Sequence, residues 1–380
     1  MKEPKIRFQG FTGEWEESAI GEISSSFSGG TPSVSVAKYY GGEIPFIRSG
    51  EINENKTQLF LTEEGLNSSS AKLIEKGTLL YALYGATSGE VGISKISGAI
   101  NQAILAIYPK NGHSPEYMSH YLKSKKNDII RVLLQGGQGN LSGALVKNIT
   151  ISLPTNLNEE YLLAKCINTL DSLIQSTNKK IESLKQVKAA SLQSMFPQEG
   201  ETTPRVRFKG FEGEWDVVTI DSICKKSVSK HSENSLGENV GQYPIYGASG
   251  YIQNIETYDF DVPYVGVIKD GSGVGRSQLY PAYSSILGTM QYILPKGDMD
   301  VTFLAYLFET INFSSYVNGS SIPHIYFKDY SIKNVKVPSI NEQRVIGEYF
   351  QNLDSQIALL SQQLEKLQQI KSACLDKMFV

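Results

Sequence analysis

Two long stretches of the chain carry apolar or small side chains in alternating steps of three and four residues. The first runs from Ile167 to Met195 and the second from Phe350 to Met378. A 3.5-residue period held over about four heptads is typical of a coiled coil. We therefore predict two long helices that pair as an antiparallel coiled coil; the alternative is that each helix packs separately on its own domain. The residues predicted to pair the helices are Leu170, Ile174, Ile181, Leu184, Leu353, Ile357, Leu364 and Leu367.

Shorter apolar or alternating runs outside these stretches predict β-strands. Residues that favour turns, mainly Gly, Ser and Asn, separate the runs. Two further segments, 115–124 and 301–311, follow Pro-Lys dipeptides and are predicted to be helices. This mixture indicates an α+β fold. The predicted strands are 79–83, 103–108, 149–153, 264–268, 292–294 and 332–337.

The ends of the long helices are predicted from capping signals. Asn158 and Asn341 are each followed by Glu, which is typical of a helix N-terminus. Pro197 ends the first helix, and the polar segment 198–203 is predicted to be an exposed linker. The predicted order is a globular domain at 1–155, a helix at 156–197, the linker at 198–203, a second domain at 204–337 and a second helix at 338–380.

The two halves of the chain repeat each other at their ends. Residues 4–15, Pro-Lys-Ile-Arg-Phe-Gln-Gly-Phe-Thr-Gly-Glu-Trp, return at 204–215 with eight of twelve positions identical. Residues 158–196 return at 341–379 with 14 identities in 39 positions. The offset falls from 200 to 183, so the second domain is about 17 residues shorter than the first. The chain is therefore predicted to be an internal tandem duplication that presents two different surfaces on one scaffold.

Composition restricts the class of protein. The 380 residues are 40% hydrophobic and 20% charged, and no apolar run approaches the roughly 18 residues that a membrane span needs. The three cysteines form no CxxC pair, which argues for a reducing cytosol and against a disulfide framework or a zinc site. We expect a cytoplasmic protein without membrane contact. The net charge of −3 argues only weakly against nucleic-acid binding, because phosphate contacts depend on a local basic surface.

No set of residues in the sequence predicts catalysis. Gly271-Ser-Gly-Val-Gly275 is similar to a nucleotide-binding loop, but a turn and a strand follow it instead of the helix that such a loop requires. Glu54-Asn-Lys56 has a nuclease-like spacing, yet no aspartate precedes it to share a metal ion. The four histidines have no metal-ligand spacing. We expect a non-catalytic chain without a metal or cofactor of its own.

Polar loops beside the predicted strands are the remaining candidate sites. Arg, Lys, Asn, Gln and Ser side chains match the donors and acceptors on base edges in the major groove of DNA. A solvated turn is the more common role for any one such residue, but the set as a whole predicts a DNA-binding surface. In the first domain the set is Thr31, Arg48, Ser49, Tyr84, Thr87, Ser88, Asn101, Gln102, Gln138 and Asn140. In the second it is Tyr246, Ser249, Lys269, Ser272, Arg276 and His324.

The repeats resemble the specificity subunits of type I restriction–modification systems. The resemblance covers the whole chain and rests on Arg-Phe-x-Gly-Phe-x-Gly-Glu-Trp in each half, Gly29-Gly-Thr-Pro32, Tyr39-Tyr-Gly-Gly-Glu-Ile-Pro-Phe46 and the Asn-Glu…Leu-Asp…Met-Phe helices. The second half keeps no close match to Gly-Gly-Thr-Pro or Tyr-Gly-Gly-Glu-Ile-Pro. Its segment 241–251 is similar to another variety of the same domain. The two halves are therefore expected to read different bases.

This resemblance implies a non-enzymatic subunit with two target-recognition domains, each reading one half of a bipartite sequence in double-stranded DNA. The paired helices would fix the gap between the half-sites and would dock two modification (methyltransferase) subunits. Restriction (nuclease/translocase) subunits would complete the complex. S-adenosylmethionine, ATP and Mg²⁺ are expected on these partners, in the cytoplasm of a prokaryote.

Two other classes of protein remain as alternatives. One is a stand-alone DNA methyltransferase or nuclease, which the missing cofactor and metal motifs disfavour. The other is a coiled-coil scaffold that binds proteins without DNA specificity. A purified chain that shifts duplex DNA only when a modification subunit is added would separate both from the specificity subunit.

Overall fold

A computed structural model of the chain describes residues 3–133 and 140–380, which form two compact units. Unit 1 is Met1–Thr177 with Gln363–Val380, and unit 2 is Asn178–Gln362. Each unit therefore combines a globular domain with parts of both long helices. No helix within the described residues is long and apolar enough to cross a membrane.

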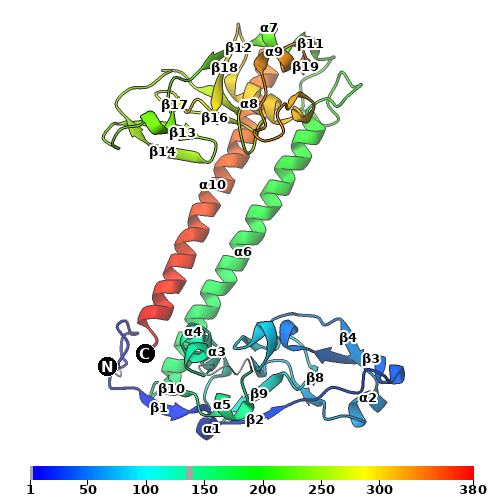
Figure 1. The fold of residues 1–380 in the computed structure, drawn as a ribbon, viewed down its shortest axis with the longest axis vertical. Helices are drawn as coiled ribbons and strands as arrows, with labels where there is room; N and C mark the ends of the chain where they lie inside the picture. The colour runs from blue at the N-terminus through cyan, green and yellow to red at the C-terminus, as the bar shows by residue number, and fades with distance from the viewer. Residues whose placement is uncertain (1–2, 134–139) are drawn as a thin grey trace. The chain divides into compact units, whose positions relative to one another are not determined.

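The two long helices, α6 (Leu157–Met195) and α10 (Ile340–Lys377), run antiparallel to each other (Figure 1). Polar pairs join them in unit 1 near the start of α6 and in unit 2 near its end. In each pair the two residue numbers add up to 540 or 542, so both units share one antiparallel register. The pairs are Asp171–Lys371 in unit 1, and Lys188–Asp354 and Ser191–Tyr349 in unit 2.

All eight predicted helix-pairing residues are buried or half-buried. Ile181 is 5% exposed and Leu353 is 7% exposed. Two apolar residues of α10 outside the predicted seam face solvent, since Leu359 is 67% exposed and Ile370 is 50% exposed. The antiparallel coiled coil predicted from the heptad pattern is confirmed.

The predicted N-cap residues were wrong by a short distance. Asn158 lies inside α6, and its N–H donates to Oδ1 of Asn156 over 2.9 Å. Asn156 therefore caps the helix. Asn341 likewise lies inside α10, which begins at Ile340. The glutamates that follow lie in the first turn of each helix, as expected.

Unit 1 contains a two-stranded ribbon and two four-stranded sheets. The ribbon pairs β1 (Glu16–Ala19) with β10 (Thr150–Leu153). The first sheet has the order β2 (Ser24–Ser28), β9 (Ile104–Pro109), β6 (Leu79–Ala82) and β7 (Val91–Ile93). The second has the order β4 (Leu59–Leu61), β3 (Tyr40–Ile47), β8 (Gly98–Ile100) and β5 (Lys72–Ile74). Its helices besides α6 and α10 are α1 (Ile20–Ile23), α2 (Glu63–Asn67), α3 (Pro115–Ser124), α4 (Lys126–Leu133) and α5 (Gly143–Lys147).

Unit 2 repeats this arrangement with one strand fewer. The ribbon pairs β11 (Asp216–Thr219) with β19 (Asn334–Val337). The sheets are β12 (Cys224–Val228), β18 (Met290–Pro295), β15 (Tyr264–Ile268) and β16 (Ser277–Tyr280), and β14 (Gly250–Ile255), β13 (Tyr243–Gly247) and β17 (Ser285–Ile286). Its short helices are α7 (Ile220–Ile223), α8 (Val301–Glu309) and α9 (Phe327–Tyr330).

The size difference between the halves lies mainly in two connections. Residues 48–58 join β3 to β4 in unit 1, whereas only residues 248–249 join β13 to β14 in unit 2. Equivalent strands β2 and β12 begin 200 residues apart, whereas β9 and β18 begin 186 apart. Unit 1 has α2 and β5 between β4 and β6, while the fully described segment 256–263 of unit 2 contains no helix or strand. The remaining three residues are lost between β9 and α6, because α6 and α10 begin 183 apart. The duplicated α+β fold is confirmed.

The repeated Met-Phe at the end of each long helix completes a core. In unit 1, the ring of Phe379 stacks on Tyr117 with centroids 5.4 Å apart, and Tyr117 meets Trp15 edge-on at 6.1 Å. In unit 2, Phe196 meets Trp215 edge-on at 6.0 Å. Each helix therefore begins beside one domain and ends in the core of the other unit, which explains why its last residues are repeated.

An arginine–glutamate pair joins the N-terminal repeat to the long helix in each unit. Arg7 Nε lies 2.7 Å from Glu159 Oε1, and Arg207 Nε lies 2.7 Å from Glu342 Oε1. Both glutamate side chains are 1% exposed, and the hydrogen bond that each arginine donates to its glutamate raises the pKa of the arginine. Each arginine also donates to a carbonyl oxygen of the turn that follows it. The repeated Arg-Phe-x-Gly-Phe motif thus anchors the domain to its helix.

Replacing Arg207 by Ala is expected to lower the free energy of unfolding of unit 2 by about 3–5 kcal/mol, because it leaves a buried carboxylate without its partner. Urea unfolding in a Trp15→Phe background measures this effect, since Trp215 is then the only tryptophan. The matched control is Arg205→Ala. Arg205 pairs with Glu201 but is 66% exposed, and the expected change is below about 1 kcal/mol. Equal small losses for both variants would contradict the anchoring role.

Candidate nucleic-acid interface

Several predicted DNA-binding residues of unit 1 lie together where its strands end. The Tyr84 hydroxyl donates to the backbone oxygen of Gln102 over 2.6 Å, and the Thr31 hydroxyl hydrogen-bonds to the Gln102 side chain. The N–H of Asn101 donates to the last carbonyl oxygen of β3 over 3.3 Å, which places it beside Arg48. Residues from four separate loops therefore share one surface.

A fifth segment joins this surface through the loop between β6 and β7. The Ser88 hydroxyl and the N–H of Leu141 both donate to the carbonyl oxygen of Leu83, over 3.1 Å and 2.8 Å. The exposed Asn140 therefore lies next to the loop. Gln138 lies outside the described residues. We name this surface the unit 1 loop cluster: Thr31, Arg48, Ser49, Tyr84, Thr87, Ser88, Asn101, Gln102 and Asn140.

Within the cluster, Arg48 is held in one orientation by Glu51. Arg48 Nε and Nη2 donate to the two carboxylate oxygens over 3.3 Å and 3.0 Å, and Nη2 also donates to Gln58 Oε1 over 3.1 Å. Burial opposes ionisation of Glu51, but hydrogen bonds from Arg48, Gln58 and Thr57 outweigh it and lower its pKa. The hydrogen bond to Glu51 raises the pKa of Arg48. The pair is thus fully ionised at neutral pH and carries no net charge. Ser49 lies half-buried in the turn between the two partners.

The predicted residues of unit 2 lie in equivalent loops. The loop between β15 and β16 carries Lys269, Ser272 and Arg276. The N–H of Ile325 donates to the carbonyl oxygen of Lys269 over 2.9 Å, and His324 pairs with Asp270 in an antiparallel bridge. The Lys269 ammonium forms an ion pair with the Asp270 carboxylate. Four predicted residues are therefore brought together.

Tyr246 and Ser249 belong to the hairpin of β13 and β14. The Tyr246 ring lies 4.9 Å from the ring of Tyr280 in β16. The N–H of Leu287 donates to the carbonyl oxygen of Tyr246 over 2.9 Å, a contact equivalent to the one between Asn101 and β3. Ser249 is exposed in the hairpin turn. We name these residues the unit 2 loop cluster: Tyr246, Ser249, Lys269, Ser272, Arg276 and His324.

The glycine loop between β6 and β7 and the one between β15 and β16 share a backbone conformation but differ in their side chains. Gly85 and Gly89 have φ of +82° and +80°, and Gly271 and Gly275 have φ of +86° and +87°. These left-handed values favour glycine. In both loops the N–H of the second glycine donates over 2.9 Å to the last carbonyl oxygen of the preceding strand. Between the glycines, Ala-Thr-Ser in unit 1 is replaced by Ser-Gly-Val in unit 2. One scaffold therefore presents two chemically different loops.

The structure bears on the metal and nucleotide sites that the sequence made candidates. Within 3–133 and 140–380, no group of three or more His, Cys, Asp or Glu side chains could hold a metal ion. The Gly271–Gly275 loop leads into β16 and opens no helix, so it lacks the helix N-terminus that binds a dinucleotide phosphate. The clusters can offer hydrogen bonds and charge.

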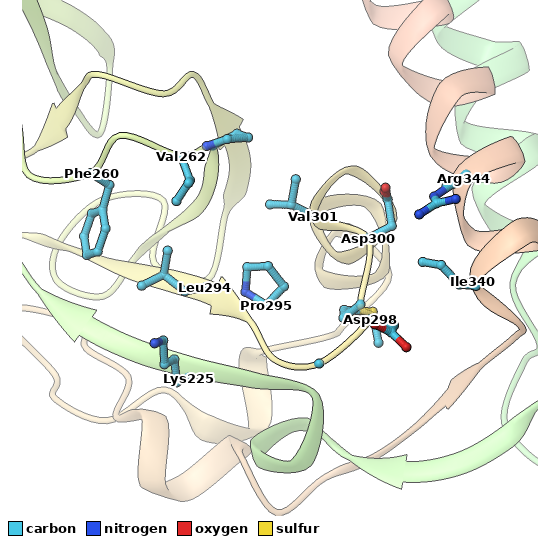
Figure 2. Close-up of a pocket in the computed structure, with 13 residues that line it drawn as sticks. Lys225, Phe260, Val262, Leu294, Pro295, Asp298, Asp300, Val301, Ile340 and Arg344 are labelled. Atoms are coloured by element: carbon cyan, nitrogen blue, oxygen red, sulfur yellow. The ribbon is translucent and has the colours of Figure 1, made fainter.

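A cavity of about 570 Å³ in unit 2 lies away from its loop cluster. Figure 2 shows Leu294, Pro295 and Val301 around it, with Arg344 of α10 at its rim. Pro295 ends β18, whereas the loop cluster lies beside Met290, where β18 begins. The six-residue strand separates the two places by roughly 17–20 Å. No predicted DNA-binding residue lines the cavity.

Three residues of these sites, Glu51, Gln58 and Asp270, were not among the DNA-binding residues predicted from the sequence. Gln58 reaches Arg48 only because β3 pairs with β4. Asp270 follows Lys269 directly, and its bridge to His324 depends on a segment 54 residues later. The three-residue spacing of Arg48 and Glu51 was the one local indication of their ion pair, and this spacing occurs in many ordinary turns.

Comparison with known proteins gives a match to one family over both halves of the chain. The family described as "Type I restriction modification DNA specificity domain" matches residues 12–186 and 212–369. The MjaIX specificity subunit of Methanocaldococcus jannaschii is 25% identical over 233 residues, 59% of this chain and 51% of that protein. The MjaVIII specificity subunit of the same organism is 21% identical over 96% of this chain and 91% of that protein. The EcoR124I/EcoR124II specificity subunit of Escherichia coli is 26% identical over 43% of each.

These matches differ in length, since the chain spans about half of the MjaIX protein and less than half of the EcoR124I protein. Among solved structures, the S subunit of a type I restriction–modification system from M. genitalium has the same fold. It superposes with a TM-score of 0.73 at 17% identity and covers 100% of this chain and 99% of that one.

Proposed function

Because the chain belongs to the type I restriction modification DNA specificity family, we propose that it reads a bipartite DNA target with one half-site for each unit. In this proposal it acts as a recognition subunit and not as an enzyme, which is supported by the specificity-subunit names of its relatives. In this proposal the unit 1 loop cluster contacts one half-site and the unit 2 loop cluster contacts the other. The individual contact residues and the domain limits at 155/156, 203/204 and 337/338 remain predictions.

One observation carries this proposal: the two units share a backbone but differ in the loops that end their strands. The shared parts are the ribbon, the sheet order, the glycine φ values and the Arg–Glu anchor. The differing parts are the polar side chains of the two loop clusters. Base edges are told apart by hydrogen-bond pattern, so two loop sets on one scaffold suit two different half-sites.

The paired helices are proposed to dock two modification subunits, with restriction subunits completing the complex. The pseudo-repeated halves support this, because two similar surfaces can bind two copies of one partner. Substrate methylation and cleavage would use S-adenosylmethionine, ATP and Mg²⁺ held by these partners in a prokaryotic cytoplasm.

Co-expression with a modification subunit tests the proposed function. Sequencing of methylated adenines in the host genome should show one motif with two specified halves and a non-specific spacer. The chain alone should not shift duplex DNA, and the complex should. A continuous motif, or methylation that is independent of the chain, would disprove bipartite recognition. Complex formation with no methylated motif would instead favour the protein-binding scaffold.

Inserting one heptad between Lys180 and Ile181 is expected to lengthen the non-specific spacer while both half-site sequences stay the same. Seven residues keep the hydrophobic seam in phase and add about 10 Å of helix, or roughly three base pairs. Bulging against the unextended α10 would reduce the gain to one or two base pairs. Methylation mapping of the variant measures the spacer.

The control for this variant is a seven-residue insertion between Glu199 and Gly200, two exposed residues of the linker. It adds the same number of residues outside the helices and should leave the spacer unchanged. An active heptad variant that methylates the original motif with its original spacer would show that the helices do not set the spacer length. The helices would then serve only as a docking surface.

A further inference from the structure

We infer that Arg48 reads a guanine in the half-site of unit 1, with Glu51 as the residue that positions it. The inference rests on the proposed function, because it names the base class that one cluster recognises. It starts from the Glu51 carboxylate, whose side chain is 13% exposed. This carboxylate accepts hydrogen bonds from the backbone and side chain of Arg48, the Thr57 hydroxyl and the backbone of Gln58. These hydrogen bonds occupy both carboxylate oxygens and hold the Arg48 guanidinium in one orientation.

The geometry leaves one edge of this guanidinium available. Nε and Nη2 face the carboxylate, so the outward edge consists of Nη1 and the second N–H of Nη2. No described residue accepts a hydrogen bond from Nη1, and the second N–H of Nη2 donates to the side chain of the exposed Gln58. The Arg48 side chain is 41% exposed. Two parallel N–H groups on a fixed plane match O6 and N7 of guanine in the major groove. The guanine would replace the Gln58 amide oxygen.

Charge favours a base over a phosphate as the ligand. Phosphate contacts draw on an uncompensated cation, whereas Arg48 is neutralised by Glu51 at 3.0 Å. Guanine offers two neutral acceptors with a fixed direction, which a pre-oriented guanidinium binds at little cost in side-chain entropy. The neighbours Asn101 and Gln102 add amide groups to the same surface.

Unit 2 has no arginine at the equivalent place. The parallel pair Ile47–Ile100 of unit 1 corresponds to Tyr246–Ile286 of unit 2, so Arg48 corresponds to Gly247. Guanine recognition by an Arg48–Glu51 pair is therefore confined to the half-site of unit 1, and unit 2 serves as an internal comparison.

The test measures DNA binding by the complex of the full chain with its modification subunit. Each guanine of the unit 1 half-site is replaced in turn by 7-deazaguanine, which lacks the N7 acceptor. We expect one position at which the wild type loses about tenfold or more in affinity. Arg48→Ala should lose about 10- to 100-fold on the natural target and be insensitive to 7-deazaguanine at that position. Glu51→Gln should lower specific affinity, because the guanidinium is no longer fixed in one orientation. It should not weaken non-specific binding, because it leaves the site one charge more positive.

The matched control is Arg131→Ala. Arg131 forms an equally spaced pair with Asp128 in α4 but is 71% exposed, and its removal should leave both affinities unchanged. Thermal unfolding checks that each variant folds, and the 7-deazaguanine series on the wild type needs no variant at all. A half-site of unit 1 in which no guanine responds to loss of N7 overturns the inference. So does an Arg48→Ala variant that weakens all sequences equally and lowers the salt slope by about one, since that identifies a phosphate contact.

Failure of the inference about Arg48 can be distinguished from failure of the proposed function. An exchange of residues 1–155 that leaves both half-sites unchanged defeats the proposed function. An exchange that changes one half-site, together with an Arg48→Ala variant that still discriminates against 7-deazaguanine, defeats only the role of Arg48.

Discussion

Exchanging residues 1–155 for the same segment of a relative is expected to replace one half of the methylated motif and leave the other half intact. The unit 1 loop cluster lies within this segment, and the unit 2 loop cluster lies outside it. The predicted boundary falls between β10 and α6, so the exchange leaves the long helix whole. Methylation mapping in the host measures both half-sites at once.

The donor segment must preserve two contacts with the long helices. Arg7 has to meet Glu159, and Trp15 and Tyr117 have to pack around Phe379. A donor without an arginine at position 7 would unfold unit 1 for reasons unrelated to recognition. The matched control exchanges 204–337, which should change only the other half-site. If either exchange altered both half-sites, independent recognition by the two units would be wrong.

Replacing both Leu364 and Leu367 by Asp is expected to abolish soluble complex formation with the modification subunit. The register of the polar pairs places Leu367 opposite Ile174 and Leu364 opposite Thr177. Both leucines are at least half-buried, as are the residues opposite them. Two carboxylates placed there without partners would cost several kcal/mol. Both α10 and the part of unit 1 that packs on it should lose stability.

Thermal unfolding of the chain and co-elution with the modification subunit measure the two effects of this variant. The matched control is Leu359→Asp with Ile370→Asp, which adds the same charge to the exposed side of α10. The control should unfold within a few degrees of the wild type. Loss of co-elution by the control with unchanged unfolding would place a partner contact on the exposed side. A Leu364→Asp, Leu367→Asp chain that assembles and methylates normally would show that the seam lies elsewhere.

The patterns that are local in sequence determined most of the secondary structure. The heptad steps predicted α6 and α10 because residues that repeat every 3.5 positions lie on one face of a helix in a coiled coil, and this spacing can be read from the local sequence. The apolar runs predicted β6, β15 and β19 to within two residues at each end, and segment 115–124 is α3. The repeats predicted two copies of one fold, because similar sequences at both ends of each half contribute the same kinds of residue to the two cores.

Contacts between distant residues were decided only by the tertiary structure. Arg7 and Glu159 meet across 152 residues, and nothing in either local sequence marks Glu159 as buried. The polar loops were predicted as a set, but their arrangement depends on which strands pair. Arg48 meets Gln58 through the pairing of β3 with β4, and lies beside Asn101 through the pairing of β3 with β8. Strand register follows from the packing of whole sheets and not from the period of a single strand, so the sequence alone could name the candidate residues but could not bring them together.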